Sequence, residues 1–216
     1  MRLQYVDQTC IGITSEEGVV IVVDPVEIGG FGGPGEEARM WADLAIMTWN
    51  KDGAEGGIRS LKGDPMRIDA AGPQEIKGIK IVGHPCPSPE QVQDNERGVI
   101  IYHMDLDGIR LLHTGKLNHV PNREFKKQIG PLDLLFIPVG GYGTLNSAQA
   151  DDVVNLFDPR VVVPMHRPSG AMGFEMERVD IFLKGKKGVK KLPSKTEVSR
   201  NSLPNSREIW ILAPTK

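Results

Sequence analysis

The turn TWNKDG, residues 48–53, combines an aromatic ring, an ammonium and a carboxylate directly after the apolar run ADLAIM, which predicts a short buried strand. Such a turn could hold a ligand, and its residue types limit which one. The Lys51 ammonium has no lone pair to give a cation, whereas the Asp52 carboxylate has several. Taken alone, Trp49 is better explained as a core or cleft-lining aromatic than as a substrate platform.

Other residues that could do chemistry are scattered along the chain. His166 follows the apolar run VVVPM and by itself indicates a structural residue at a strand end. Lys116 is either a salt-bridge lysine, which is favoured, or an amine with a lowered pKa. We interpret His113 and His119 as structural. The glycine-rich segment 27–37 lacks the G-K-[ST] of a P-loop and predicts a loop that could act as a lid.

Strand patterns dominate the elements that must position these residues. A hairpin is predicted from CIGIT and VVIVVDP around residues 15–18. A helix is predicted between two apolar strands, with Asn146 as N-cap, Gln149 three residues later and a stop at Asp158, which gives a βαβ unit. Further strands are expected at residues 43–47, 79–82, 98–104, 108–112, 133–139, 160–165 and 208–214, and further helices at 122–130 and 174–185.

Composition excludes several classes of protein. A chain of 216 residues with 39% hydrophobic content predicts one domain over residues 1–216. The N-terminus lacks a signal-peptide pattern, and no run approaches the roughly 20 apolar residues of a membrane helix. Two cysteines are too few for a disulfide framework, so we expect both to be reduced in a cytoplasmic protein with no membrane association.

The formal charge of −2 gives no global attraction to nucleic acid. One lysine-rich segment, residues 184–195, departs from this balance. It has no interleaved aromatic residues of the kind that stack on bases. A solvated loop is therefore favoured over a polyanion-binding segment, and nucleic acid is not expected as a partner.

The run from Arg97 to Met172 closely resembles the metallo-β-lactamase superfamily, specifically the small zinc-dependent hydrolase-like branch related to ascorbate-phosphate lactonase. The resemblance rests on HTGKLNH where that branch has H-x-G-D-L-G-H, on the PVGG turn followed by Thr144, and on the strand that closes in PMH at His166. Earlier, Asp24 ends a matching strand, and TWNKDG falls where the branch has T-H-x-H-x-D-H. This resemblance implies an α/β (α+β) fold, a four-layer αββα sandwich with its active site at one edge of the two sheets.

The resemblance also implies which metal-ligand positions are kept and which are altered. Retained positions are Asp52, His84 and His166. Altered positions are Trp49, Lys51, Gly53 and Lys116, the last standing where a bridging aspartate is expected, and Gln8 replaces a further histidine. Neither of the two implied metal sites keeps more than two protein ligands, against the three of an open catalytic zinc site.

These substitutions favour a divergent homologue that acts as a binding or assembly module, with no cofactor expected and a small molecule or a protein as partner. The alternative is a zinc- or manganese-dependent hydrolase of a small ester, lactone or phosphate-containing substrate that uses Asp52, His84 and His166. Metal-free chemistry is a variant of that alternative, with His166 or Lys116 as acid or base. The catalytic candidates are thus Asp52, His166 and Lys116.

The exchange of ligands for cations suggests a specific hypothesis. Lys116 takes the place of the lost metal charge and pairs with Asp52, because a half-buried carboxylate needs a partner. Lys116→Ala is then expected to destabilise the fold more than the loss of a surface lysine does.

Overall fold

Two β-sheets form most of the computed structural model, which describes residues 1–28, 39–49, 54–88, 98–168 and 176–215. Within these residues, the sheets have the strand orders β13-β1-β2-β3-β4-β5 and β12-β14-β11-β10-β9-β8-β7-β6. The first sheet contains β1 (Arg2–Asp7), β2 (Cys10–Thr14), β3 (Val20–Val23), β4 (Leu44–Ile46), β5 (Met66–Ile68) and β13 (Lys195–Glu197). The second contains β6 (Gly72–Ile76), β7 (Ile79–Cys86), β8 (Val99–Leu106), β9 (Ile109–His113), β10 (Leu134–Pro138), β11 (Val161–Met165), β12 (Val189–Leu192) and β14 (Glu208–Leu212).

The main apolar core lies between the two sheets. Alternate side chains of each strand point to the same face, so every second residue of a strand enters this core. Ile11 and Ile13 of β2 belong to it from one sheet, and Tyr102, Met104 and Phe136 from the other. All five side chains are buried. The predicted hairpin of β2 and β3 is confirmed, with the two strands antiparallel.

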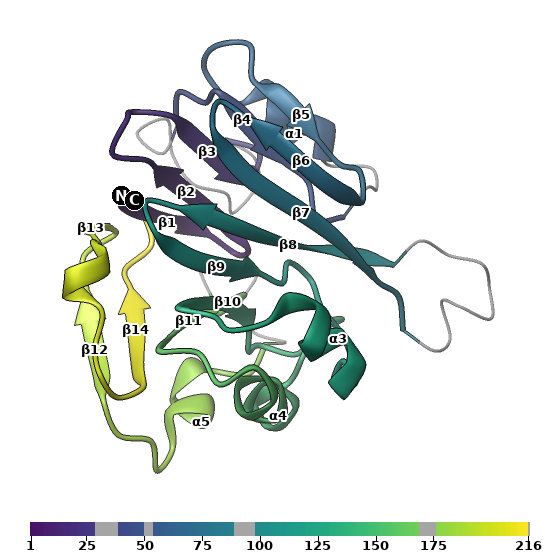
Figure 1. Cartoon of the computed structure of the whole chain (residues 1–216). Helices are drawn as coiled ribbons and strands as arrows, with labels where there is room; N and C mark the ends of the chain where they lie inside the picture. The colour runs from purple at the N-terminus through teal and green to yellow at the C-terminus, as the bar shows by residue number, and fades with distance from the viewer. Residues whose placement is uncertain (29–38, 50–53, 89–97, 169–175, 216) are drawn as a thin grey trace.

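Helices cover the outer faces of the sheets (Figure 1). Three of them, α3 (Arg123–Ile129), α4 (Ser147–Phe157) and α5 (Val179–Leu183), contribute to a second apolar cluster on the eight-stranded sheet. The outer face of the other sheet packs against a smaller cluster that includes Leu61, just beyond the short helix α1 (Ala54–Arg59). The predicted αββα architecture is confirmed. No helix among the described residues is long and apolar enough to cross a bilayer.

The predicted βαβ unit consists of β10, α4 and β11. Strands β10 and β11 are parallel neighbours. The Asn146 side chain accepts from the Gln149 backbone N–H, and the Gln149 side chain accepts from the Asn146 N–H, so the predicted N-cap is a complete capping box. The helix ends at Asp158, as the sequence predicts, and the structure shows this residue in the left-handed conformation. The unit fixes where β11 ends and therefore where His166 lies.

Two sequence-based expectations are corrected. The lysine-rich segment is not only a loop, because Val189–Leu192 forms the edge strand β12, which pairs in parallel with β14. The helix expected over residues 174–185 is shorter, since α5 spans only Val179–Leu183, and residues 174 and 175 lie outside the described part of the chain.

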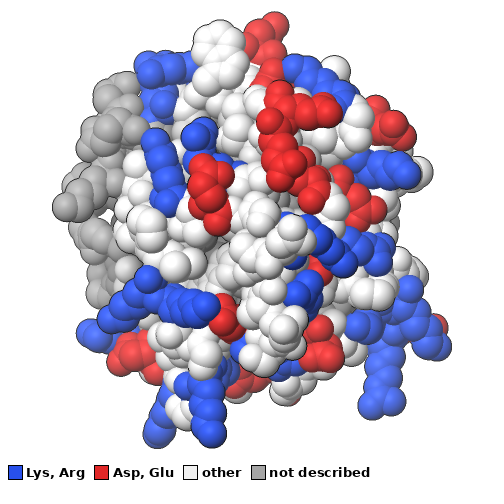
Figure 2. All heavy atoms as spheres, turned by 60° about the vertical axis from the view of Figure 1, so that its left-hand side comes forward, with Lys and Arg blue, Asp and Glu red and all other residues white. Residues whose placement is uncertain are grey.

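Two lysines of this segment have acidic partners. Lys190 lies 2.8 Å from Glu208, and Lys186 lies 2.9 Å from Asp151. Figure 2 shows basic and acidic side chains interspersed on this side of the molecule, without one continuous basic surface.

Candidate functional site at the sheet edge

Several strands and loops end at one edge of the two sheets, where their polar side chains meet. The backbone N–H of His166, just after β11, donates to Gln8 O in the turn between β1 and β2 at 2.9 Å. His113 at the end of β9 contacts Thr9 O of the same turn at 2.9 Å. Since β9, β10 and β11 are parallel, their carboxyl ends share this edge. These contacts join the two sheets at the candidate site.

Asp24 fixes the end of β4 against the end of β3. Its carboxylate accepts from the backbone N–H of Thr48 at 2.8 Å and from the Thr48 hydroxyl at 2.7 Å. Gly115, in the loop after β9, packs directly against Thr48, because a Cβ built on Gly115 would lie 2.1 Å from Thr48 Oγ1. Gly115 also has a φ of +55°, which favours glycine. Glycine is therefore what lets the next residue, Lys116, approach this edge.

The Lys116 ammonium lies against an aromatic face. Its Nζ is 4.2 Å from the centroid of the Trp49 ring, which is the geometry of a cation–π contact. Partial burial lowers the pKa of the Lys116 amine, and the negative charge of Asp24 acts in the opposite direction. The cation is thus held by a ring and a nearby carboxylate at the sheet edge.

His166 is buried beside this lysine with one ring nitrogen engaged. The Thr144 hydroxyl donates to Gly141 O at 2.8 Å, so its single proton is used there. His166 Nδ1, 3.2 Å from Thr144 Oγ1, must then carry a proton and donate to that oxygen. Burial, helped by the positive charge of Lys116, lowers the pKa of His166 to about 4. The imidazole is neutral at pH 7, and its Nε2 keeps a free lone pair.

His113 has no such free nitrogen. Gly115 N donates to its Nδ1 at 3.2 Å, so Nε2 carries the proton and donates to Thr9 O. The side chain is fully buried, and burial lowers its pKa. These two hydrogen bonds support the structural role predicted for His113.

The family profile described as Beta-lactamase superfamily domain matches residues 2–166. The matched range includes every side chain of the edge described above, from Asp24 to His166. The chain belongs to this superfamily.

Curated superfamily relatives match over a limited part of their length. A UPF0173 metal-dependent hydrolase of Thermococcus onnurineus is 35% identical over 97 residues, 44% of this chain and 43% of the relative. A UPF0173 protein of Pyrococcus abyssi is 36% identical over 72 residues, 32% of this chain and 33% of the relative. Each match therefore spans less than half of the relative.

Solved structures match almost the whole chain. A proposed Zn-dependent hydrolase of the metallo-β-lactamase superfamily from Thermotoga maritima has a TM-score of 0.81 and 25% identity, with 98% of this chain and 97% of that chain covered. A proposed metal-dependent hydrolase from Parabacteroides distasonis has a TM-score of 0.65, 16% identity and coverages of 97% and 91%, a likeness that shows the fold alone. The predicted metallo-β-lactamase fold is confirmed.

The structure groups Trp49, Lys116 and His166, three of the positions that the superfamily resemblance singles out. Lys51, Asp52 and Gly53 lie outside the described residues. The predicted pairing of Lys116 with Asp52 stays a prediction.

The structure does not bring His84 to this group. His84 pairs across the ladder with Ile101, which belongs to the apolar cluster under the helices and not to the core between the sheets. Its ring lies 6.0 Å from that of Phe125 in α3 and 6.4 Å from that of His103. Paired residues in a ladder point to the same face, so His84 faces the helices. We therefore correct its expected placement and assign it no ligand role.

The described residues do not fit the two-metal centre that the superfamily implies. Among the residues that the structure describes, no three His, Cys, Asp or Glu side chains converge as a metal site. Lys116 places an ammonium beside His166, whose Nε2 has the one free imidazole lone pair described above. A positive charge repels a metal ion and has no lone pair to offer it. The described donor set therefore supports no metal-dependent step.

Sequence reasoning gave no role to Thr48 or Gly115. Thr48 stands in the TWNKDG turn and Gly115 immediately precedes Lys116, so both lie inside quoted motifs. Their importance comes from the contact between them in the folded chain. The two residues are 67 positions apart in the sequence, so neither motif alone predicts this contact.

Proposed function

We propose that this chain is a divergent superfamily member that binds a small anionic molecule, a carboxylate or phosphate ester, at the sheet edge. The observation that carries this proposal is the Lys116 ammonium held 4.2 Å from the centre of the Trp49 ring, beside a neutral His166. An ammonium attracts carboxylate or phosphate oxygens, and partial burial strengthens that attraction. The free Cys10 and Cys86 thiols are in keeping with a reducing compartment, so we place this activity in the cytoplasm.

His166 adds a second polar contact to the proposed ligand site. Its neutral ring donates from Nδ1 to Thr144, which leaves Nε2 as an acceptor. A ligand hydroxyl could donate to Nε2 while an anionic group of the same ligand contacts Lys116. With a hydrolysable ligand, the same nitrogen could accept a proton from water as a general base.

Metal-dependent hydrolysis of a small ester, lactone or phosphate-containing substrate is the second candidate, and the printed names of the relatives favour it over binding alone. A relative from Thermococcus onnurineus is named a metal-dependent hydrolase, and the solved Thermotoga maritima protein a proposed Zn-dependent hydrolase. Zinc or manganese would need Asp52 together with His166 and ligands that the described residues do not supply.

Elemental analysis separates the two candidates. Protein purified without chelator is expected to contain far less than one equivalent of zinc, manganese or iron. Near-stoichiometric metal, together with hydrolysis of a small ester or lactone that a chelator abolishes, would establish the second candidate and overturn the first.

Calorimetric titration tests the binding proposal directly, with inorganic phosphate and phenyl phosphate as probes at low ionic strength. We expect Lys116→Met to weaken binding at least tenfold, because it removes the charge and keeps an apolar stem of similar length. Lys80→Met, which removes an exposed lysine of β7, is the matched control and should bind as the wild type does. Equal binding by both variants would contradict the role of Lys116.

A further inference from the structure

Residues other than glycine that have a positive φ fall into two groups in the described part of the chain. In one group the local structure requires this conformation. Lys77 and Asp107 each precede a glycine in the tight turns that join β6 to β7 and β8 to β9, and Asp158 caps α4. The remaining members lie at the sheet edge of the candidate site: Gln8, Asp24, Tyr142 and His166.

Contacts within the protein account for all of these edge residues except Tyr142. Gln8 O accepts from the backbone N–H of His166, and the Asp24 carboxylate accepts from Thr48. Tyr142 is a bulky residue, for which a φ of +49° is strained. Its side chain is 67% exposed and makes no hydrogen bond, ion pair or ring contact with the described residues. No such contact of the Tyr142 ring therefore offsets the strain.

The turn that carries Tyr142 is held against His166 on both sides. Before Tyr142, a Cβ built on Gly140 would lie 2.1 Å from His166 O and 3.6 Å from His166 Nδ1, so only glycine fits there. After it, Thr144 Oγ1 lies 3.2 Å from the same nitrogen. Consecutive Cα atoms are about 3.8 Å apart, so the Tyr142 Cα lies within about 7.6 Å of the Cα of either residue. An exposed phenol ring is thus attached to the turn that orients His166.

Hydrogen bonds and glycines fix the backbone of this turn. The Gly141 N–H donates to Leu145 O at 2.9 Å, and the Thr144 N–H donates to Gly141 O at 3.2 Å. Gly141 and Gly143, on either side of Tyr142, have φ values of +65° and +79°, which glycine adopts without strain. Tyr142 is the residue of this turn whose type conflicts with its backbone conformation. Such a conflict is typical of functional positions.

We propose that Tyr142 stacks on a planar ring of the bound ligand, so that the sheet edge selects a phosphate or carboxylate that carries an aromatic group. This inference rests on the proposed function, because the anionic group of the same ligand contacts Lys116. Aromatic rings attract one another in offset-stacked or edge-to-face arrangements. The backbone of the turn is already fixed, so binding needs to order only the torsions of the tyrosine side chain.

The test is calorimetric titration of the full chain with inorganic phosphate, phenyl phosphate and cyclohexyl phosphate at low ionic strength. We expect the wild type to bind phenyl phosphate about fivefold more tightly than inorganic phosphate, and cyclohexyl phosphate less tightly than phenyl phosphate. In Tyr142→Ala the preference for phenyl phosphate should fall below about twofold, with unchanged affinity for inorganic phosphate. Tyr142→Phe should keep the preference, because the ring remains.

Two further variants separate stacking from a structural role. Trp41→Ala is the matched control, since Trp41 is an aromatic residue that is 62% exposed and precedes β4, at the end of that strand away from the site. It should keep the preference for phenyl phosphate. Tyr142→Gly removes the ring and the strain together. It should lose the preference as Tyr142→Ala does, and should unfold at a higher temperature than Tyr142→Ala.

Several results would overturn this inference. If the preference for phenyl phosphate is the same in the wild type and in Tyr142→Ala, while Lys116→Met still weakens phosphate binding, the stacking fails and the anion site stands. A wild type that binds none of the three probes would overturn the proposed function and this inference with it. Equal binding of cyclohexyl and phenyl phosphate would exclude ring stacking. A lower unfolding temperature for Tyr142→Gly than for Tyr142→Ala would contradict the strain from which the inference starts.

Discussion

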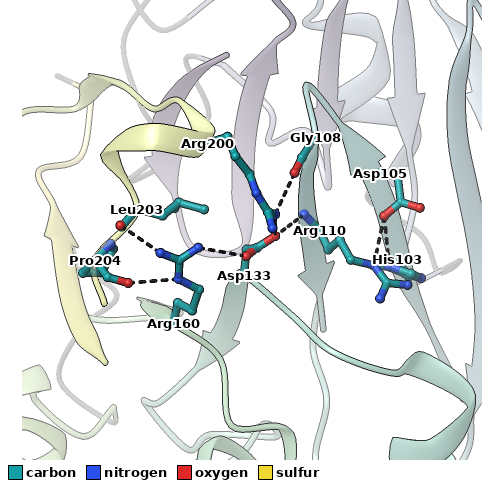
Figure 3. Close-up of polar contacts among 9 residues, drawn as sticks. All are labelled: His103, Asp105, Gly108, Arg110, Asp133, Arg160, Arg200, Leu203 and Pro204. Atoms are coloured by element: carbon teal, nitrogen blue, oxygen red, sulfur yellow. Dashed lines mark hydrogen bonds and ion pairs between the residues drawn. The ribbon is translucent and has the colours of Figure 1, made fainter. Parts of the chain in front are cut away.

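Strands β9, β10 and β11 are parallel, and the ionisable side chains near their two ends differ in how completely they are paired. At the amino ends, Asp133 lies just before β10 with its side chain 8% exposed. Its carboxylate is 2.7 Å from Arg200 Nη1 and 3.5 Å from Arg160 Nη1, and accepts from the Arg110 backbone N–H at 2.9 Å (Figure 3). This carboxylate is fully paired.

The arginines around Asp133 have second partners as well. Arg160 donates to Leu203 O and Pro204 O, each at 2.9 Å, and Arg200 donates to Gly108 O at 2.8 Å (Figure 3). The network thus ties the 3-10 helix Arg200–Ser202 and the residues after it to the sheet. Each of these bonds joins two groups of the protein itself. This is typical of a structural ion-pair network.

At the carboxyl ends of the same strands, the ionisable side chains are less completely paired. Lys116 faces a Trp49 ring, and His166 keeps an unprotonated Nε2. Ionisable groups that are buried near one another without full pairing are typical of binding and catalytic sites. The comparison therefore separates a structural ion-pair network at the amino ends from the proposed ligand site at the carboxyl ends.

The largest effect is expected for Asp133→Ala. Removing one partner of a buried pair leaves uncompensated charges, so the free energy of unfolding should fall by about 3 kcal/mol. Urea unfolding measures this. Asp105→Ala is the control, because Asp105 is 45% exposed and lies 3.2 Å from Arg110 Nε, and it should lose at most about 1 kcal/mol. Equal losses would remove the contrast between a buried and an exposed pair.

Gly115→Ala is expected to have the next largest effect, about 2 kcal/mol, through a strained positive φ and displacement of Thr48. Gly78→Ala is the control, because Gly78 has a similar φ of +76° and no atom lies within 4 Å of the added carbon. Its loss of stability therefore measures the backbone strain alone. Thermal unfolding should show a larger loss for Gly115→Ala, accompanied by weaker phosphate binding. If the free energy of unfolding falls equally in the two variants, the contact between Gly115 and Thr48 does not contribute to stability.

The pH dependence of stability should be smaller and should depend on His166. Above about pH 6.5 both folded and unfolded chains carry a neutral His166. Between pH 6.5 and 4 the unfolded chain binds a proton that the folded chain does not, so stability falls as pH falls. The decrease from pH 7 to 5 due to this residue is about 2 kcal/mol.

His166→Asn measures that contribution, since asparagine tolerates the positive φ of 50° at this position. Urea midpoints at pH 7 and 5 should show a smaller decrease in the variant than in the wild type. An unchanged decrease would assign the acid sensitivity to other buried histidines, such as His113.

The smallest change in stability, below about 1 kcal/mol, is expected for Lys116→Met, because losing a partly buried charge also removes its desolvation penalty. The pKa of His166, followed by NMR, should rise, since Lys116 is one cause of its depression. A loss of several kcal/mol would instead support the predicted pairing of Lys116 with Asp52.

Much of the fold was predictable because the signals are local. The apolar runs of β10 and β11 and the Asn146 capping box depend on residues close in sequence. Strand β12 was not predicted, because its four residues are half lysine and its pairing partner, β14, begins 16 residues after β12 ends. Packing against a neighbour decided that element, in line with the strong context dependence of strand formation.

The candidate site was predictable only in part. The positions of Lys116, His166 and Trp49 follow from motif resemblance, and the structure groups them. His84 also matched a motif, but it lies on the other face of its sheet. Successive side chains of a strand point to opposite faces, so an offset of one residue in a loose motif alignment reverses the side.

By itself, the sequence determined the superfamily, the positions of most strands along the chain and the exchange of metal-ligand residues for cations, because these are properties of residue type and local pattern. Only the tertiary structure decided that Lys116 lies against Trp49, that Gly115 packs on Thr48, and that Thr144 contacts His166. These are contacts between distant segments, and their distances are set by how the two sheets pack and where each strand ends.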